Sequence, residues 1–230
     1  MASSPSATPS SNAWPNIPDL GLACLKGEIV SVIKDKIGFY KNKFRHRNLD
    51  NFYFIHINKT GGSSIENALK IPFEHKTARE KIAEVGLDKW RRRFTFAIVR
   101  NPWDKVVSHY CYRVKTNQTG LSASSMSFSD WVERAYWYKD PAFRDKEKMF
   151  MPQVEWVRST EGGFLVDYVG YFEDLEGSFD EAMKRTGLTA SLPHLKSTKR
   201  RDYRDYYDAS SRQIVAESFA DDIEAFNYSF

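Results

Sequence analysis

Cysteine is scarce in this chain, and long apolar runs are missing from it. Only two of the 230 residues are cysteines, Cys24 and Cys111, so nothing indicates a disulfide framework or a cysteine metal site. No run approaches the roughly 18 apolar residues of a membrane span. The N-terminus also lacks the charged start and apolar centre of a secretory signal. We therefore expect a cytoplasmic protein without a transmembrane segment.

A strong excess of one charge is missing as well. The chain has 34 basic and 30 acidic residues, a net charge of +4. This mild balance permits anionic ligands without demanding nucleic acid, and we expect no nucleic-acid partner. The five histidines show no ligand spacing, so no metal site is predicted. The hydrophobic content of 41% predicts a globular chain with a substantial core.

The N-terminal region divides into a polar part and a periodic part. Residues 1–19 are rich in Ser, Ala, Pro and Asn, which is typical of a flexible tail. Residues 22–44 carry apolar side chains at spacings of three and four, which predicts an amphipathic helix with a lysine-rich outer face. We expect this helix to pack on a single domain formed by residues 20–230. Peripheral contact with a membrane through its basic face is the alternative.

Alternating strands and helices dominate the rest of the chain. Apolar runs that begin at Phe52, Phe94 and Leu165 have the length of buried strands, and a helical pattern follows each of them. Asn101, Pro102 and Asp104 form the sharpest helix start, as an N-cap, a first-position proline and a first-turn acid. This order predicts an α/β fold of three layers with a central, mainly parallel sheet.

The first strand turns into its helix through a polar, glycine-containing segment. Such a turn points several backbone N–H groups and the positive end of the helix dipole at one spot. Two glycines let a ligand approach the backbone, a lysine adds a charge, and three hydroxyls offer donors. The segment therefore predicts a phosphate cradle made of Lys59, Thr60, Gly61, Gly62, Ser63 and Ser64. It differs from the Walker A loop, in which the lysine follows the glycines.

Two segments together carry a resemblance to a known family. Residues 55–64 (IHINKTGGSS) and 96–108 (FAIVRNPWDKVVS) resemble the sulfotransferases that use 3′-phosphoadenosine-5′-phosphosulfate (PAPS). The likeness is to the family-2 branch, which contains carbohydrate and bacterial small-molecule enzymes, and it runs from about Phe52 to Phe230. It implies a sulfotransferase fold similar to that of P-loop nucleotide-binding proteins, with PAPS as donor and adenosine 3′,5′-bisphosphate (PAP) as product.

The resemblance also implies roles for individual residues. It assigns the cradle, Lys59 to Ser64, to the 5′-phosphosulfate, and Arg100 and Ser108 to the 3′-phosphate. The basic loop near residue 200 resembles a segment that closes over the nucleotide, which adds Lys196, Ser197, Lys199 and Arg200. One departure is Asn58, because many relatives have proline there; asparagine is expected to leave the loop freer.

The implied reaction is an in-line, metal-independent transfer of the sulfo group to a hydroxyl or amine of a carbohydrate or small metabolite. Lys59 would meet the charge that builds on the leaving oxygen. The acceptor must lose a proton, and His75, which lies between the two motifs, is the preferred general base, with Glu74 as the runner-up. His56 is placed in a strand, which suggests a packing role, although the alternation of side chains along a strand could turn it toward the cleft.

Two other functions stay open at this point. One is an ATP- or GTP-dependent kinase on a related fold, which the order of lysine and glycines argues against. The other is a non-catalytic module that binds anionic polymers or membranes through its basic segments. The sequence leaves the identity of the acceptor and the oligomeric state undetermined.

Overall fold

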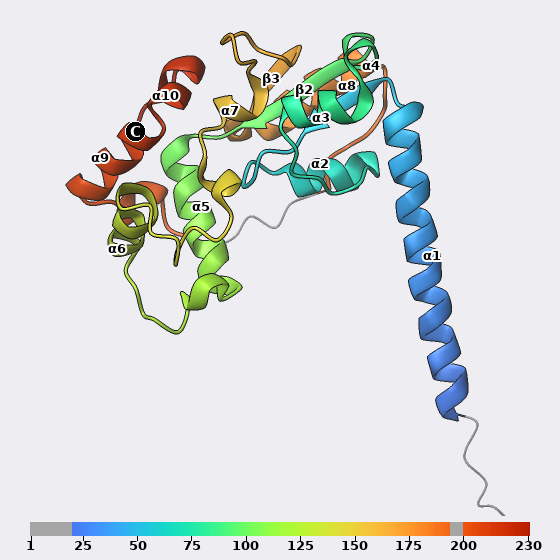
Figure 1. The fold of residues 1–230 in the computed structure, drawn as a ribbon, viewed down its shortest axis with the longest axis horizontal. Coiled ribbons are helices and arrows are strands. Elements are labelled where there is room, and N and C mark those ends of the chain that lie inside the picture. The colour runs from blue at the N-terminus through green and yellow to red at the C-terminus, as the bar shows by residue number, and fades with distance from the viewer. Residues whose placement is uncertain (1–19, 194–199) are drawn as a thin grey trace, which may run out of the picture. The chain divides into compact units, whose positions relative to one another are not determined.

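The computed structural model describes residues 20–193 and 200–230 (Figure 1). Its contacts divide the chain into two units, Met1–Lys41 and Asn42–Phe230. The first unit contains most of helix α1 (Leu20–Asn48), which includes the helix predicted over 22–44. Its packing on the domain stays a prediction, and the tail predicted at 1–19 lies outside the described residues. Nowhere in the described ranges does a helix combine the length and apolarity needed to cross a bilayer.

The centre of the second unit is a parallel sheet. Its strands are β1 (Phe52–Ile55), β2 (Phe94–Val99) and β3 (Tyr168–Tyr171), in the order β1-β2-β3. Phe54 pairs with Phe96, and Ala97 pairs with Val169, in parallel register. The prediction of an α/β fold with a parallel sheet is confirmed. The third strand is shorter than the apolar run that begins at Leu165.

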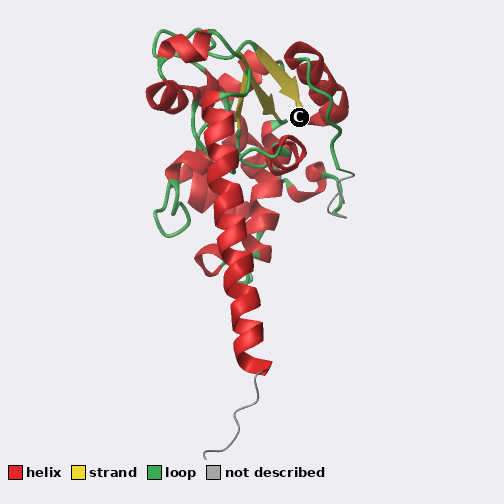
Figure 2. Ribbon diagram, turned by 90° about the vertical axis from the view of Figure 1, so that its right-hand side faces the viewer, coloured by secondary structure: helices red, strands yellow, loops and turns green. Residues whose placement is uncertain are grey.

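Helices cover both faces of this sheet, because successive strand residues point to opposite sides. Tyr53, Ile55, Ala97 and Val99 belong to a buried cluster with residues of four short helices. These helices are α3 (Ala78–Val85), α4 (Leu87–Arg91), α7 (Val154–Val157) and α10 (Ala220–Phe226). Phe52, Phe54, Phe96 and Ile98 pack on the other face against α2 (Gly62–Leu69) and α8 (Leu175–Thr186). Figure 2 shows the strands with helices around them.

Helix α5 (Pro102–Lys115) starts where the sequence predicts. The side chain of Asn101 accepts hydrogen bonds from the backbone N–H groups of Trp103 and Asp104, at 3.1 and 3.5 Å. This N-cap fixes the first turn of α5 directly after β2. The residues that follow β2 are thereby held at the carboxyl edge of the sheet.

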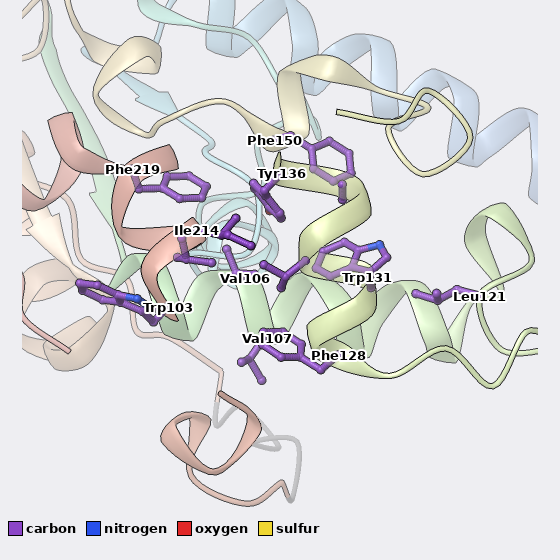
Figure 3. Close-up of a cluster of buried hydrophobic side chains, with 13 residues drawn as sticks. Trp103, Val106, Val107, Leu121, Phe128, Trp131, Tyr136, Phe150, Ile214 and Phe219 are labelled. Atoms are coloured by element: carbon purple, nitrogen blue, oxygen red, sulfur yellow. The ribbon is translucent and has the colours of Figure 1, made fainter. Parts of the chain in front are cut away.

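A third buried cluster lies beside α5, away from the sheet (Figure 3). It joins α5 to α6 (Phe128–Val132), a π-helical turn (Glu133–Trp137) and α9 (Ala209–Ser218). The chain breaks between α9 and α10 at Phe219, whose φ of −124° is not helical. Phe219 is fully buried against Tyr136, and the bend lets both helices pack.

Short 3₁₀ helices complete the described part of the chain. They are Gln118–Gly120, Glu147–Phe150, Phe172–Asp174 and Tyr203–Tyr206. Helix α8 ends at Gly187, which has a φ of 70°, a left-handed conformation that favours glycine.

Candidate active site

A cleft of about 1170 Å³ opens at the carboxyl ends of β1 and β2. Open α/β sheets bind their ligands at this edge. The cleft brings together nine of the residues assigned from the sequence, namely Lys59, Gly61, Gly62, Ser63, Ser64, His75, Arg100, Ser108 and Arg200. The residues from the two motifs therefore face one common space.

Of the four other residues assigned from the sequence, three lie outside the described residues, and the fourth, Thr60, has a hydroxyl that is hydrogen-bonded within the turn. Lys196, Ser197 and Lys199 lie outside the described residues. Thr60 is buried, and its hydroxyl donates a hydrogen bond to the carbonyl oxygen of Ile57 at 2.9 Å. This bond closes the turn after β1, so the hydroxyl of Thr60 braces the cradle.

The turn between β1 and α2 has a backbone suited to an anion. Lys59 and Gly61 have φ values of 67° and 82°, in the left-handed region. Gly61 is the N-cap of α2 and offers no side-chain hydrogen bond to the first N–H groups of the helix. The N–H of Ser64 donates to the carbonyl oxygen of Gly61 at 3.0 Å, so the N–H groups of Gly62 and Ser63, together with the helix dipole, are the ones offered to a ligand.

Asn58 ties this turn to the other wall of the cleft. Its side-chain amide donates a hydrogen bond to the carbonyl oxygen of Met149 at 3.0 Å, and the residue is buried. The sequence-based expectation of a freer loop is therefore wrong for this residue: tertiary hydrogen bonding fixes the position where a proline would have restricted φ.

Gly62 is required by the histidine beneath it. A Cβ atom at Gly62 would lie 2.0 Å from Cδ2 and 2.3 Å from Nε2 of His56. His56 itself lines the cleft, which is the alternative to the packing role that its place in a strand suggested. The glycine pair in the sequence indicates a position without room for a side chain, but it does not indicate that His56 is the residue that fills this room.

We expect Gly62→Ala to lower the free energy of unfolding by about 1 to 3 kcal/mol, because overpacking forces the His56 ring or the turn to move. Without this clash, replacing glycine by alanine in a helix would raise the free energy of unfolding by roughly 1 kcal/mol. Thermal and urea unfolding measure the effect. Gly163→Ala is the matched control, because a Cβ there meets only Ser159 Oγ at 4.0 Å. Combining Gly62→Ala with His56→Ala should recover much of the loss, and strictly additive losses would contradict the clash.

Lys59 is a half-buried cation that has no anionic partner among residues 20–193 and 200–230. Burial and the nearby Arg100 lower the pKa of Lys59 to about 8. The ammonium nitrogen lies 4.1 Å from the centre of the Tyr112 ring, and no carboxylate in the described ranges forms an ion pair with it. A bound anion would favour the charged lysine and raise its pKa.

Arg100 is held rigidly at the end of β2. Its Nε and Nη2 atoms donate to one oxygen of Asp104 at 2.9 and 2.7 Å, and Nη1 donates to the carbonyl oxygen of Lys59 at 2.9 Å. The guanidinium also lies over the Phe172 ring, 3.9 Å from its centre. The second oxygen of Asp104 accepts a hydrogen bond from Arg200. Asp104 therefore joins the two arginines, a role that sequence reasoning missed because it explained this acid by the helix dipole.

The backbone of Arg100 is clamped by Gln153. The side-chain oxygen of Gln153 accepts the N–H of Arg100 at 2.9 Å, and its amide nitrogen donates to the carbonyl oxygen of Arg100 at 2.8 Å. The buried carboxylate of Asp222 in turn accepts the N–H of Gln153 at 2.8 Å. Burial raises the pKa of Asp222. No local pattern in the sequence predicts this clamp, because its members are far apart in the chain.

His75 has the tautomer that a general base needs. Its Nδ1 atom lies 3.0 Å from the carbonyl oxygen of His56. A carbonyl can only accept, so Nδ1 carries the proton and Nε2 keeps its lone pair. Burial lowers the pKa of His75, the largest cause, so the ring is neutral at pH 7.

The runner-up base is engaged elsewhere. The carboxylate oxygens of Glu74 lie 3.3 Å from Nζ of Lys76 and 2.8 Å from Nζ of Lys81. Glu74 is not among the residues that line the cleft. Of the two candidates from the sequence, the geometry favours His75.

The cleft also contains cations that the sequence analysis did not single out. Arg113, Lys146 and Arg201 line it, as does the buried His109, whose pKa is held well below its usual value by burial. Arg113 forms an ion pair with Asp145 at 2.8 Å. These residues belong to no motif that the sequence shows, and only the packing of the fold brings them to the cleft.

Comparison with known proteins agrees with the two motifs. A sequence model of the sulfotransferase family matches residues 42–229. An uncharacterized protein of Archaeoglobus fulgidus is 31% identical over 109 residues, which cover 47% of this chain and 79% of that protein. No solved structure matches the chain. Because the family match covers most of the chain, including both motifs and the cleft residues described above, this protein belongs to the sulfotransferase family.

Proposed function

We propose that the protein transfers the sulfo group of PAPS to a hydroxyl or amine of a carbohydrate or small metabolite. The observation that carries the proposal is the single cleft shared by Lys59 and Arg100. A cleft with one cation at the end of each of two neighbouring strands suits a nucleotide with an anion on the 3′ side and another on the 5′ side of its ribose. Membership of the sulfotransferase family supports the same reaction class.

The residues of the cleft fit this nucleotide. The uncapped start of α2 and the unpaired ammonium of Lys59 would hold the 5′-phosphosulfate. Arg100, Ser108 and Arg200 would hold the 3′-phosphate. Although Arg100 donates three of its N–H groups within the protein, a guanidinium has five, so two remain for a ligand.

When bound, PAPS supplies an activated sulfuryl group with a nucleotide as its leaving group. His75 would accept the proton of the attacking hydroxyl at Nε2, while Nδ1 stays anchored on the carbonyl of His56. Lys59 would stabilise the negative charge that develops beside the cradle. Phe73 and Met149 line the cleft next to His75 and would contact the acceptor.

Thermal stabilisation by nucleotides tests the donor. We expect PAP to raise the unfolding temperature at concentrations where ATP or GTP with magnesium does not, because ligand binding to the native state stabilises it by mass action. Mass spectrometry should then detect addition of one sulfo group to a member of an acceptor panel incubated with PAPS. Equal stabilisation by ATP, with phosphate transfer, would favour a kinase instead.

A further inference from the structure

His56 and Glu66 form a buried pair beneath the cradle. Their side chains are 4% and 6% exposed, and Nδ1 of His56 lies 2.8 Å from Oε1 of Glu66. This is the distance of an ion pair, although the contact does not meet the geometry of a regular hydrogen bond. The same oxygen of Glu66 accepts the backbone N–H of Glu74 at 3.1 Å. The carboxylate thus holds one nitrogen of the imidazole ring.

The opposite edge of the ring faces the cradle. A Cβ atom at Gly62 would lie closest to the Cδ2 and Nε2 atoms of His56. Gly62 is the first residue of α2, so Nε2 lies beside the N–H groups at the start of this helix. Across the described ranges Nε2 of His56 has no hydrogen-bond partner, and the residue lines the cleft. This edge of the ring therefore lies at the start of α2, where the 5′ anion is proposed to bind.

Packing alone does not account for this arrangement. A buried carboxylate is costly unless it is paired or hydrogen-bonded, and no lysine or arginine of the described residues forms an ion pair with Glu66. An imidazolium between the carboxylate and a bound oxyanion would satisfy all three groups. The ring is held in place by Phe54, which stacks on it with a centroid distance of 5.9 Å.

We propose that His56, oriented by Glu66, is a further anion-binding residue of the cradle and donates its Nε2–H to the 5′ anion of the nucleotide. Glu66 acts as a positioning residue, because it contacts only the far nitrogen. This inference rests on the proposed function. The rings of His56 and His75 pack against each other with a centroid distance of 4.4 Å, but the hydrogen bond that anchors His75 goes to the backbone carbonyl of His56.

Two nucleotides that differ at the 5′ position test the proposal. His56→Asn keeps an amide N–H near Glu66 but has no group that reaches the cradle; Glu66→Gln removes the charge with little change of shape. We expect each variant to bind PAP about tenfold more weakly or worse, as for the loss of a charged hydrogen bond. Binding of adenosine 3′-monophosphate, which lacks the 5′ anion, should stay within about twofold of wild type. Isothermal titration calorimetry measures both.

His46 offers a matched control. It is also a buried histidine with a carboxylate partner, Asp50, at 3.2 Å, and it does not line the cleft. His46→Asn should leave the affinity for PAP unchanged. Undiminished PAP binding by His56→Asn, or equal losses for both nucleotides, would overturn the inference. If one variant fails to fold, the other gives the same test. Binding of PAP by the wild-type protein shows whether the proposed function itself holds. If the proposed function fails, the wild-type protein binds neither nucleotide; if only the inference on His56 fails, the wild-type protein still binds PAP.

Discussion

His75→Asn should lower kcat about 10³-fold and leave the affinity for PAP within about twofold, because general-base catalysis contributes roughly 10² to 10⁴ to a rate. The amide N–H of asparagine can replace the Nδ1–H donor that contacts the carbonyl of His56 at 3.0 Å. The fold is therefore retained, but no basic nitrogen remains at the position of Nε2. Steady-state turnover with a saturating acceptor measures kcat, and calorimetry measures the affinity for PAP.

The neighbouring Glu74 supplies the control for this experiment. Glu74→Gln changes the runner-up base, whose carboxylate pairs with Lys76 and Lys81 away from the cleft. We expect its turnover per folded molecule to match wild type. A large loss in Glu74→Gln together with normal turnover in His75→Asn would assign the base to Glu74 and remove His75.

Lys59→Met should weaken PAP binding about 10- to 100-fold at pH 7, since a hydrogen bond to a charged group contributes roughly 1.5 to 3 kcal/mol. Methionine keeps the length and apolar stem that contact the Tyr112 ring but removes the ammonium. The loss should be smaller for adenosine, which has no phosphate. Equal losses for PAP and adenosine would show that the substitution acts through the shape of the cleft.

The same lysine predicts a pH dependence. Its pKa of about 8 in the free protein means that half of the molecules have lost the charge at that pH. Because the anion binds the protonated form, the affinity for PAP should fall as pH rises through 8, by up to tenfold per unit. Binding should take up a proton near pH 8, which calorimetry in buffers of different ionisation enthalpy detects.

Lys105 is the control for this titration. Burial also lowers its pKa to about 8, but it does not line the cleft. Lys105→Met should therefore keep the fall in affinity above pH 8, and Lys59→Met should abolish it. A pH dependence that survives in Lys59→Met would show that another group titrates.

The sequence alone determined the strands, the cradle and the start of α5. These features depend on neighbours in the chain: apolar runs that a parallel sheet buries on both faces, glycines at a strand–helix turn, and Asn101 as a cap for the next N–H groups. Both motifs lie at strand ends, and parallel strands place these ends at one edge. Local chemistry therefore sufficed to predict that Lys59 and Arg100 would face the same space.

Only the tertiary structure decided how the side chains of the site are held. Asp104 connects Arg100 with Arg200, Gln153 clamps the end of β2, and His56 fills the space that Gly62 leaves open. These contacts join segments that are distant in the chain, and their energies depend on burial and geometry that no local pattern encodes. For the same reason the sequence left His56 open between packing and facing the cleft, and only the fold shows that it lines the cleft.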